Sequence, residues 1–337
     1  MRLEEIGEFG LIRRLTESSA RVAALRPEVA VGPGDDAAVV RLEPGERLVA
    51  TTDILLEEVH FSWKWFTPEE IGYRAGVVNI SDVAAMGGQA RWLLVSLGLP
   101  RDMEAEAVER LQTGLAEAAQ EYGACVVGGD LSASRSGLVV VVVGLGVVKG
   151  APVLRSGALS GDALLVTGAL GASAAGLAIA RAGGPMSSEE EQLLRRHRRP
   201  RARVQEGMLL RESGLAHAMI DVSDGIAGDA ARIAEASGVR VIVDGNAVPI
   251  VAGVEETAQR LEARAVEWAL TGGEDFELLL TAAPQDVDRL RELLGEAGCP
   301  STVVGRCERG SGVEVLGADL GGVRGWDQFA SEGPDAV

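Results

Sequence analysis

Five short acidic motifs are spread along the chain, and their placement limits the folds that the chain can adopt. Each lies in a glycine-rich turn or ends an apolar segment: G-D-D-A-A (34–38), T-T-D (51–53), N-I-S-D (79–82), G-G-D (128–130) and D-V-S-D-G (221–225). α/β folds place their sites at strand ends beside glycine turns, because the backbone can approach a ligand there. One such aspartate is more often part of a local Asx turn, but five together favour a shared site.

The segments between the motifs predict alternating strands and helices. Thr67 can cap a helix whose first turn contains Pro68 and Glu70, a capping box, and which ends near Met86 before two glycines. The other expected elements are strands at 47–54, 92–97, 138–148, 163–167, 239–244 and 276–281, a strand end at 219–221 and a helix at 105–122. We expect the β-branched strand 138–148 to be buried on both faces.

A length of 337 residues is too long for one hydrophobic core of typical size and indicates two domains. A stretch rich in glycine, proline and serine begins at Gly150, so the expected domains are 1–149 and 150–337. The alternation of strands and helices in both halves predicts the α/β class, with mixed α+β character.

The formal net charge is −18, from 32 basic and 50 acidic side chains. A chain this acidic repels nucleic acid and anionic membranes, so we expect neither as a partner. No uncharged apolar stretch approaches the ~20 residues of a membrane span, and residues 1–6 do not resemble a signal peptide. Three scattered cysteines suit a reducing compartment. These features together predict a cytoplasmic protein.

Carboxylates that converge without a cation repel one another, so the motifs predict bound metal ions. Oxygen ligands without a histidine–cysteine cluster favour Mg²⁺ or Mn²⁺ over zinc, and Mg²⁺ usually joins a few carboxylates to substrate phosphates. A nucleotide polyphosphate is the expected partner. For Asp82 taken alone, an aspartate that is simply hydrogen-bonded near its helix end remains an equal alternative.

Two other patterns carry no function in this interpretation. Gly168 and Gly171 open a helix after a strand, but the full dinucleotide-binding spacing is absent, so they are expected to allow close packing. The basic segment 195–201 lacks interleaved aromatic residues and is interpreted as a solvated face. The P-loop and protein-kinase signatures are also missing.

The motifs, taken in order, resemble those of the thiamine-monophosphate kinase family, within the superfamily of aminoimidazole ribonucleotide synthetase and selenophosphate synthetase. The matching stretches are G-E-F-G-L-I (7–12), G-P-G-D-D-A-A-V (32–39), T-T-D-I-L-L-E-E-V-H-F (51–61), N-I-S-D-V-A-A-M-G (79–87), G-G-D (128–130), R-S-G-A-L-S-G-D (155–162), V-T-G-A-L-G-A-S-A-A-G-L (166–177), D-V-S-D-G-I (221–226), L-T-G-G-E-D-F-E-L (270–278) and G-W-D-Q-F (325–329). The resemblance runs essentially end to end.

The resemblance implies transfer of the γ-phosphoryl group of ATP to thiamine monophosphate, with several Mg²⁺ ions. The implied metal ligands are Asp36, Thr51, Thr52, Asp53, Asp82, Asp130, Asp221 and Asp224. Of these, Asp53, Asp82, Asp130 and Asp221 are the implied catalytic residues. ATP contacts are implied for Gly129, Asp130, Arg155 and Ser223, and thiamine contacts for His60, Glu274 and Trp326. Family members are homodimers whose N-terminal sheets join into a barrel, and their C-terminal domain is an α/β sandwich.

The chain departs from the family at Glu58, where a glycine is common two residues before the histidine. Another ATP-using enzyme of the superfamily, a cyclo-ligase or selenophosphate synthetase, remains an alternative. The latter usually carries a reactive cysteine near its N-terminus, whereas the first cysteine here is Cys125. A non-catalytic Mg-nucleotide-binding sensor is the alternative from another class.

Overall fold

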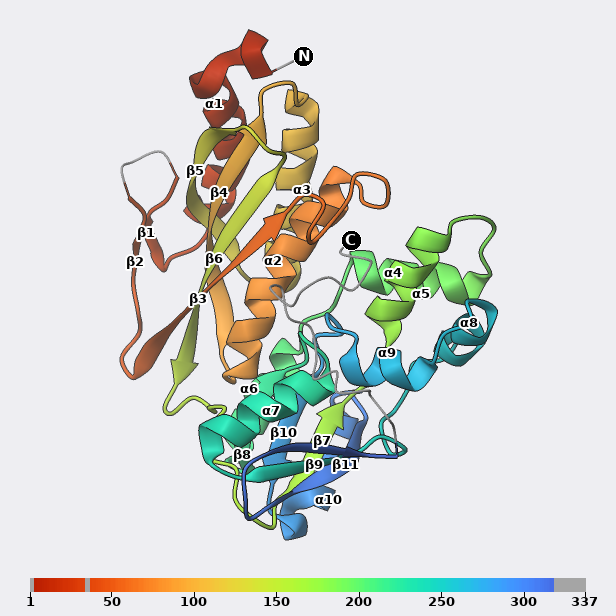
Figure 1. Ribbon diagram of the computed structural model, residues 1–337. Coiled ribbons are helices and arrows are strands. Elements are labelled where there is room, and N and C mark those ends of the chain that lie inside the picture. Colours follow the sequence, from red (N-terminus) through yellow and green to blue (C-terminus); the bar gives the residue numbers. More distant parts are fainter. Residues whose placement is uncertain (1–2, 34–36, 318–337) are drawn as a thin grey trace. The chain divides into compact units, whose positions relative to one another are not determined.

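The structure is a computed structural model that describes residues 3–33 and 37–317, and they form two compact units (Figure 1). The first contains the described residues up to Val83 and those of Gly88–Gly150. The second contains Ala84–Gly87 and the described residues from Ala151 onward. In the described part of the chain, no helix has both the length and the apolarity needed to cross a bilayer.

The first unit is built on a four-stranded sheet of order β3-β6-β4-β5, in which only β4 and β5 are parallel. Its elements are α1 (Leu3–Ala24), β1 (Val29–Val31), β2 (Val39–Val40), β3 (Glu46–Leu56), α2 (Pro68–Ala85), β4 (Gln89–Pro100), α3 (Ala105–Glu121), β5 (Cys125–Ser134) and β6 (Val139–Lys149). The helices and strands expected from the sequence here are confirmed.

The capping box at the start of α2 is present. The backbone N–H of Thr67 donates to the Glu70 carboxylate at 2.8 Å, and the N–H of Glu70 donates to the Thr67 hydroxyl at 3.3 Å. These bonds satisfy two backbone donors that have no partner inside the helix. Local sequence alone therefore sets where α2 begins.

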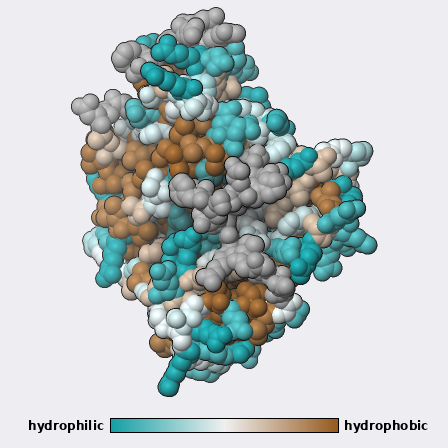
Figure 2. All heavy atoms as spheres, viewed as in Figure 1, coloured by the Kyte–Doolittle hydropathy of each residue, from teal (hydrophilic) through white to brown (hydrophobic). Residues whose placement is uncertain are grey.

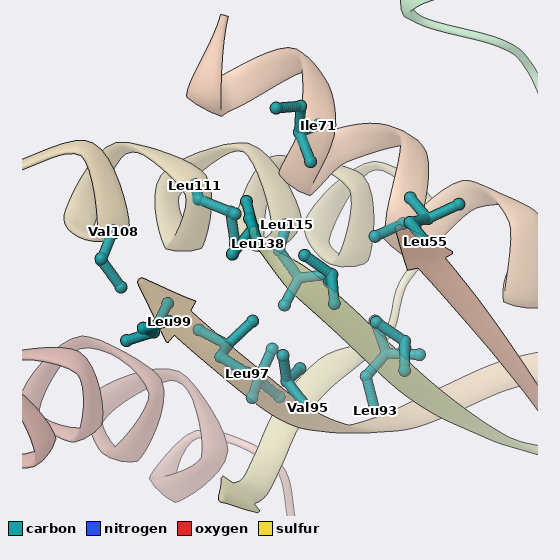
Figure 3. Packing of buried hydrophobic residues seen from close by; sticks show 14 of the residues in the cluster. Leu55, Ile71, Leu93, Val95, Leu97, Leu99, Val108, Leu111, Leu115 and Leu138 are labelled. Carbon is teal, nitrogen blue, oxygen red and sulfur yellow. The ribbon is translucent and has the colours of Figure 1, made fainter. Parts of the chain in front are cut away.

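The core of the first unit lies between its helices and one face of the sheet. Figure 3 shows Leu111 and Leu115 of α3 and Ile71 of α2 beside Val95 and Leu97 of β4. All five side chains are buried. The hydrophobic effect of this layer holds α2 and α3 against the sheet.

The prediction that strand 138–148 is buried on both faces is wrong for the single chain. Along β6, Val140 and Val142 are buried, whereas Val141 and Val143 are only half-buried. Successive residues of a strand point to opposite faces, so one face of this sheet packs on the helices and the other stays partly open. Figure 2 shows apolar side chains gathered on the first unit, and the exposed ones of β3 include Leu48 and Ile54.

The second unit is a six-stranded mixed sheet of order β12-β9-β11-β7-β10-β8. Its elements are β7 (Ala163–Thr167), α4 (Ala172–Ala182), α5 (Ser188–Arg198), α6 (Val204–Ser213), β8 (Ala216–Asp221), α7 (Ile226–Ser237), β9 (Arg240–Asp244), α8 (Val254–Arg260), α9 (Ala265–Thr271), β10 (Leu278–Ala282), η1 (Pro284–Asp286), α10 (Val287–Glu296), β11 (Ser301–Glu308) and β12 (Gly312–Leu316).

Helices cover both faces of the second sheet. Leu164 of β7 packs in the cluster that contains Ile233 of α7, whereas the next residue, Leu165, packs in the cluster of Leu294 of α10. Since neighbouring strand residues point to opposite faces, α7 and α10 lie on opposite sides. The expected α/β sandwich is confirmed.

Candidate functional site

In the first unit, one candidate site is formed by β3 and α2. The hydroxyl of Thr51 donates a hydrogen bond to Oδ2 of Asp82 at 2.5 Å. Asp53 is two residues along β3 and therefore shares the face of Thr51, and it is half-buried. Thr52 points to the other face, and its hydroxyl donates to the Val142 carbonyl at 3.1 Å. The structure therefore brings three of the predicted ligands to one face and turns the Thr52 side chain away.

Two glycines of β6 allow α2 to approach the sheet closely enough for the Thr51–Asp82 contact. A Cβ atom on Gly144 would lie 3.0 Å from Cβ of Asn79 and 3.2 Å from Cγ2 of Thr51. On Gly146 it would lie 2.4 Å from Cγ1 of Val83. Larger side chains at these positions would push α2, and Asp82 with it, away from β3.

Asn79 provides a test of whether this region suits a hard cation. Its side chain is fully buried, and its Nδ2 donates to the Ala75 carbonyl at 3.1 Å. Its Oδ1 has no hydrogen-bond partner among the described residues. A buried acceptor without a donor is costly, and it lies one helical turn from Asp82 on the same helix. An amide oxygen, a hydroxyl and carboxylates are the ligand types that Mg²⁺ prefers, so these residues fit the ion.

Gly129 and Asp130 lie on β5, at the opposite edge of the sheet from Asp53. The register pairs Asp53 with Val142 on β6, Val142 with Val95 on β4, and Val95 with Gly129 on β5. Three strand spacings separate the two edges by about 14 Å. Asp130 and Asp53 of one chain are therefore too far apart to bind one ion.

A cavity of about 120 Å³ lies beside Gly129 and Asp130. Its walls are mostly apolar, and its polar groups include Ser19 of α1 and Gln112 of α3, which are hydrogen-bonded to each other at 2.9 Å. Gly129 itself is constrained, because a Cβ there would lie 2.0 Å from the Val95 carbonyl oxygen. Gly129 therefore lets β5 lie close to the backbone of β4.

The segment after β3 places His60 close to its own strand. Nδ1 of His60 accepts the backbone N–H of Leu56 at 3.0 Å. Glu58 has a φ angle of 59°, in the left-handed region that favours glycine. That geometry gives a physical reason for the glycine that is common here in the family. The Glu58 carboxylate accepts the Ser62 hydroxyl at 2.9 Å, a contact within the same turn.

In the second unit, the predicted residues lie in two loops that are hydrogen-bonded together. Asp221 ends β8 and is buried, and Ser223 and Asp224 follow in the loop before α7. The Ser223 carbonyl accepts the N–H of Glu274 at 2.9 Å, and the Val222 carbonyl accepts that of Phe276 at 2.9 Å. The structure therefore places Glu274 beside the D-V-S-D-G loop.

The Glu274 loop has an unusual backbone. Glu274 and Phe276 have φ angles of 69° and 52°, which non-glycine residues rarely adopt. Between them, the carboxylate of Asp275 accepts the backbone N–H groups of Gly171 at 2.7 Å and Ser173 at 3.1 Å, at the N-terminus of α4. Burial raises the pKa of Asp275 from 3.8 to about 7, although the two backbone donors oppose this shift.

A buried ion pair supports the far end of this loop. Arg203 donates to both carboxylate oxygens of Glu277, at 2.5 and 2.7 Å, and also to Glu206 at 3.0 Å. The Thr167 hydroxyl donates to Glu277 at 2.6 Å. Burial raises the pKa of Glu277, whereas Arg203 lowers it. The bidentate geometry of the pair compensates for the burial of both charges.

Sequence reasoning missed two buried residues beside these loops. His197 lies on α5 and is 3% exposed, so interpreting segment 195–201 as a solvated face is wrong at that position. Its Nδ1 lies 2.9 Å from the Ser173 hydroxyl and 4.0 Å from the Glu274 carboxylate. The second is Asp229, on α7. The sequence shows an aspartate five residues after Asp224, but it does not show whether that side chain is buried or exposed to solvent.

Of the three remaining predicted residues, the structure describes only Arg155. Arg155 is exposed, and its carbonyl accepts the Ser237 hydroxyl at 3.0 Å, which ties its loop to the end of α7. Asp36 and Trp326 lie outside the described residues. Within residues 3–33 and 37–317, no three His, Cys, Asp or Glu side chains stand close enough together to hold a metal ion.

The chain matches two family domains over most of its length. Residues 34–148 match "AIR synthase related protein, N-terminal domain", and residues 160–317 match the corresponding C-terminal domain. The chain therefore belongs to the AIR synthase related proteins.

Comparison with individual proteins shows which family of the AIR synthase related proteins the chain belongs to. The thiamine-monophosphate kinase of Aquifex aeolicus is 36% identical over 98% of this chain and 100% of that protein. That of Bacillus subtilis is 37% identical over 88% of this chain and 90% of that protein. At this identity and coverage, the chain belongs to the thiamine-monophosphate kinase family.

Solved structures agree with this assignment. The thiamine-monophosphate kinase of Stenotrophomonas maltophilia K279a has a TM-score of 0.81, with 35% identity over 93% of this chain and 97% of that one. AaThiL complexed with AMPPCP and TMP has a TM-score of 0.76, with 35% identity over 97% of this chain and 98% of that one. The hydrogenase maturation protein HypE, at 20% identity and a TM-score of 0.72, shares the fold alone.

Proposed function

We propose that the protein transfers the γ-phosphoryl group of ATP to thiamine monophosphate, giving thiamine diphosphate and ADP. The observation that carries this proposal is the similarity across both units to AaThiL, whose structure contains AMPPCP and TMP. The loops that match the family motifs are present in both units. The proposal extends to domain roles: 1–149 binds ATP and metal and forms the dimer, and 150–337 completes the active site.

The proposed Mg²⁺ ligands are Thr51, Asp53, Asp82 and Asp130 of the first unit, Asp221 and Asp224 of the second, and the predicted ligand Asp36. The predicted ligand Thr52 is left out, because its side chain points to the other face of the sheet and donates to the Val142 carbonyl. Mg²⁺ supplies charge neutralisation between two phosphate-bearing reactants and holds them for in-line transfer. The protein's part is to present hard oxygens at fixed positions. The Thr51 hydroxyl donates to Asp82 and so fixes the orientation of that carboxylate.

The acceptor needs no general base. A phosphate monoester has a second pKa near ~6, so at pH 7 it is mostly a dianion and already nucleophilic. On this proposal the metal-ligating carboxylates need only to be held in position. Arg155 is exposed and can donate to a phosphate of ATP as a bidentate clamp. Ser223 and Gly129 are further proposed contacts of ATP. His60, Glu274 and Trp326 are the proposed contacts to the thiamine part.

We also propose that two copies of the chain share each site. Asp53 and Asp130 lie on the two edge strands, β3 and β5, about three strand spacings apart. One face of the sheet is only half-buried in the single chain and carries exposed apolar side chains such as Leu48 and Ile54. Closing two such sheets into one barrel would cover that face and bring the β3 edge of one copy to the β5 edge of the other.

Mixing two inactive variants tests the shared site. Asp53→Asn and Asp130→Asn should each be inactive alone. If the two carboxylates of one site come from different copies, co-refolded or co-expressed mixtures regain about a quarter of wild-type activity, since half the dimers are mixed and each has one intact site. Light scattering measures the oligomeric state in parallel. A monomer, or a mixture without regained activity, contradicts the shared site.

The catalytic proposal is tested by incubating the protein with ATP, Mg²⁺ and thiamine monophosphate. The expected result is thiamine diphosphate and ADP in equal amounts, lost when EDTA removes the metal. ADP without thiamine diphosphate would indicate another acceptor, as in other enzymes of the superfamily. Neither product would indicate a Mg-nucleotide sensor. We also propose a cytoplasmic location, since Cys125, Cys299 and Cys307 are buried free thiols.

A further inference from the structure

Asp229 is a buried carboxylate to which the sequence analysis assigns no role. It lies in the first turns of α7, and its side chain is 0% exposed. Oδ2 accepts the backbone N–H of Ser223 at 3.0 Å and that of Asp224 at 3.1 Å. One oxygen therefore binds two successive amides of the D-V-S-D-G loop and closes the turn that precedes its own helix.

The surroundings of Asp229 make its negative charge unfavourable in the folded protein. Burial raises the pKa of Asp229 well above its ordinary value, and the charges of Asp221 and Asp224 raise it further. Arg232 partly compensates, since it pairs with Asp224 and its Nε lies 3.7 Å from Oδ1 of Asp229. A buried acid beside two other acids persists only where the surrounding structure, or a function, requires it.

We propose that Asp229 is a positioning residue of the active site. By accepting both amides it fixes the Ser223–Asp224 turn, so that the Asp224 carboxylate and the Ser223 hydroxyl are held where the nucleotide and its metal bind. This role rests on the proposed function, because it concerns the same loop. Groups that hold ligating residues from behind typically change metal affinity or activity 10- to 100-fold when they are removed.

Three variants test this role. Asp229→Ala removes the acceptor and leaves two amides without a partner. Asp229→Asn retains an oxygen of the same shape that can accept both amides, but removes the charge. Glu235→Ala, a change of an exposed carboxylate on the same helix, is the matched control. The measurements are binding of AMPPCP with Mg²⁺ by calorimetry, kcat and KM, and hydrogen exchange of the Ser223 and Asp224 amides in the metal-free protein.

We expect Asp229→Ala to weaken Mg-AMPPCP binding by about 10- to 100-fold and to speed exchange of the two amides. Asp229→Asn should remain within a few-fold of wild type in binding and exchange, and Glu235→Ala should match wild type. Wild-type binding and exchange in Asp229→Ala would overturn the proposal. Asp229→Asn as impaired as Asp229→Ala would also overturn it, because the charge, and not the accepted hydrogen bonds, would then matter.

The exchange measurement separates this inference from the proposed function. It needs neither metal nor substrate, so it reports on the turn even if the wild-type protein makes no thiamine diphosphate. Faster exchange confined to Ser223 and Asp224 in Asp229→Ala supports the positioning role. Loss of protection throughout the second unit would show that Asp229 stabilises the fold in general, which overturns it.

Discussion

The two units hold their candidate site residues in different ways. In the first unit, Thr51 and Asp82 lie on a regular strand and a regular helix, and one side-chain hydrogen bond joins them. In the second unit, the Asp224 and Glu274 side chains lie in loops, and Glu274 itself has a left-handed backbone. Regular elements place a side chain through packing alone, whereas a loop needs additional hydrogen bonds to stay in one conformation.

The second unit supplies those bonds from buried acidic and basic side chains. Asp229 accepts the amides of the first loop, Asp275 binds the start of α4, and Glu277 pairs with Arg203. Each buried charge is costly unless it is well paired, and a left-handed non-glycine residue adds about 1–3 kcal/mol of strain. We infer that holding the site residues in place costs more folding free energy in the second unit than in the first. The following changes test that difference.

The largest expected effect comes from the first unit. Asp82→Asn keeps the shape of the side chain but removes the charge that is proposed to bind Mg²⁺. We expect turnover to fall by about a thousandfold or more, with an unchanged melting temperature, since α2 does not depend on that charge for packing. Activity assays and circular dichroism measure the two quantities. Near-normal turnover would mean that Asp82 only accepts the Thr51 hydrogen bond.

The next effect is on the stability of the second unit. Arg203→Met leaves Glu277 buried without its bidentate partner, and we expect a loss of about 3–5 kcal/mol in the free energy of unfolding. Arg110→Met is the control, because it breaks the bidentate pair with Glu69 on the surface of the first unit. That change should cost much less, because water screens an ion pair on the surface. If denaturant titrations showed the same loss of unfolding free energy for both variants, the proposed difference between the units would be contradicted.

A smaller loss of stability is expected from a substitution that tests the packing of α2 in the first unit. Gly146→Ala places a methyl group 2.4 Å from Cγ1 of Val83 and 2.9 Å from the Gln89 carbonyl oxygen, so α2 or the neighbouring strand must shift. We expect a destabilisation of about 1–3 kcal/mol together with a loss of activity. Gly295→Ala in α10 is the matched control, since nothing lies near its added methyl group. It should stabilise the protein by up to about 1 kcal/mol. Full activity in Gly146→Ala would show that Asp82 tolerates the shift.

A further expected effect is a pH dependence in the second unit. The pKa of Asp275 rises from 3.8 to about 7 on folding, so the folded protein favours the neutral form. The resulting stabilisation is complete below pH 3.8 and is lost as the pH rises through about 7. Melting temperatures should therefore fall between about pH 4 and 7 and level off above that, and the fall should be smaller in Asp275→Asn.

The control for this pH dependence is Asp288→Asn, which changes an exposed carboxylate of α10. It should retain the wild-type fall in melting temperature over the same range. A wild-type curve that stays flat between about pH 4 and 7 would contradict the shifted pKa of Asp275.

Much of the fold was predictable, because it depends on local patterns. The capping box of Thr67 and Glu70 set the start of α2, and apolar β-branched runs located β3, β4, β6 and β7. The burial of β6 was predicted wrongly, since a run of valines does not reveal whether anything covers its second face. The motifs also indicated which acidic segments to examine, but not which of their side chains share a face.

By itself, the sequence determined the approximate place of several strands and helices, the two-part architecture and the family, because these follow from local periodicity and from motifs read in order. The tertiary structure alone decided which residues are neighbours. It placed Asp53 and Asp130 on opposite edges of one sheet, buried His197 inside a basic segment, and turned Asp229 toward the Ser223 and Asp224 amides. Burial and partner choice depend on contacts between distant segments, and no local pattern along the chain records them.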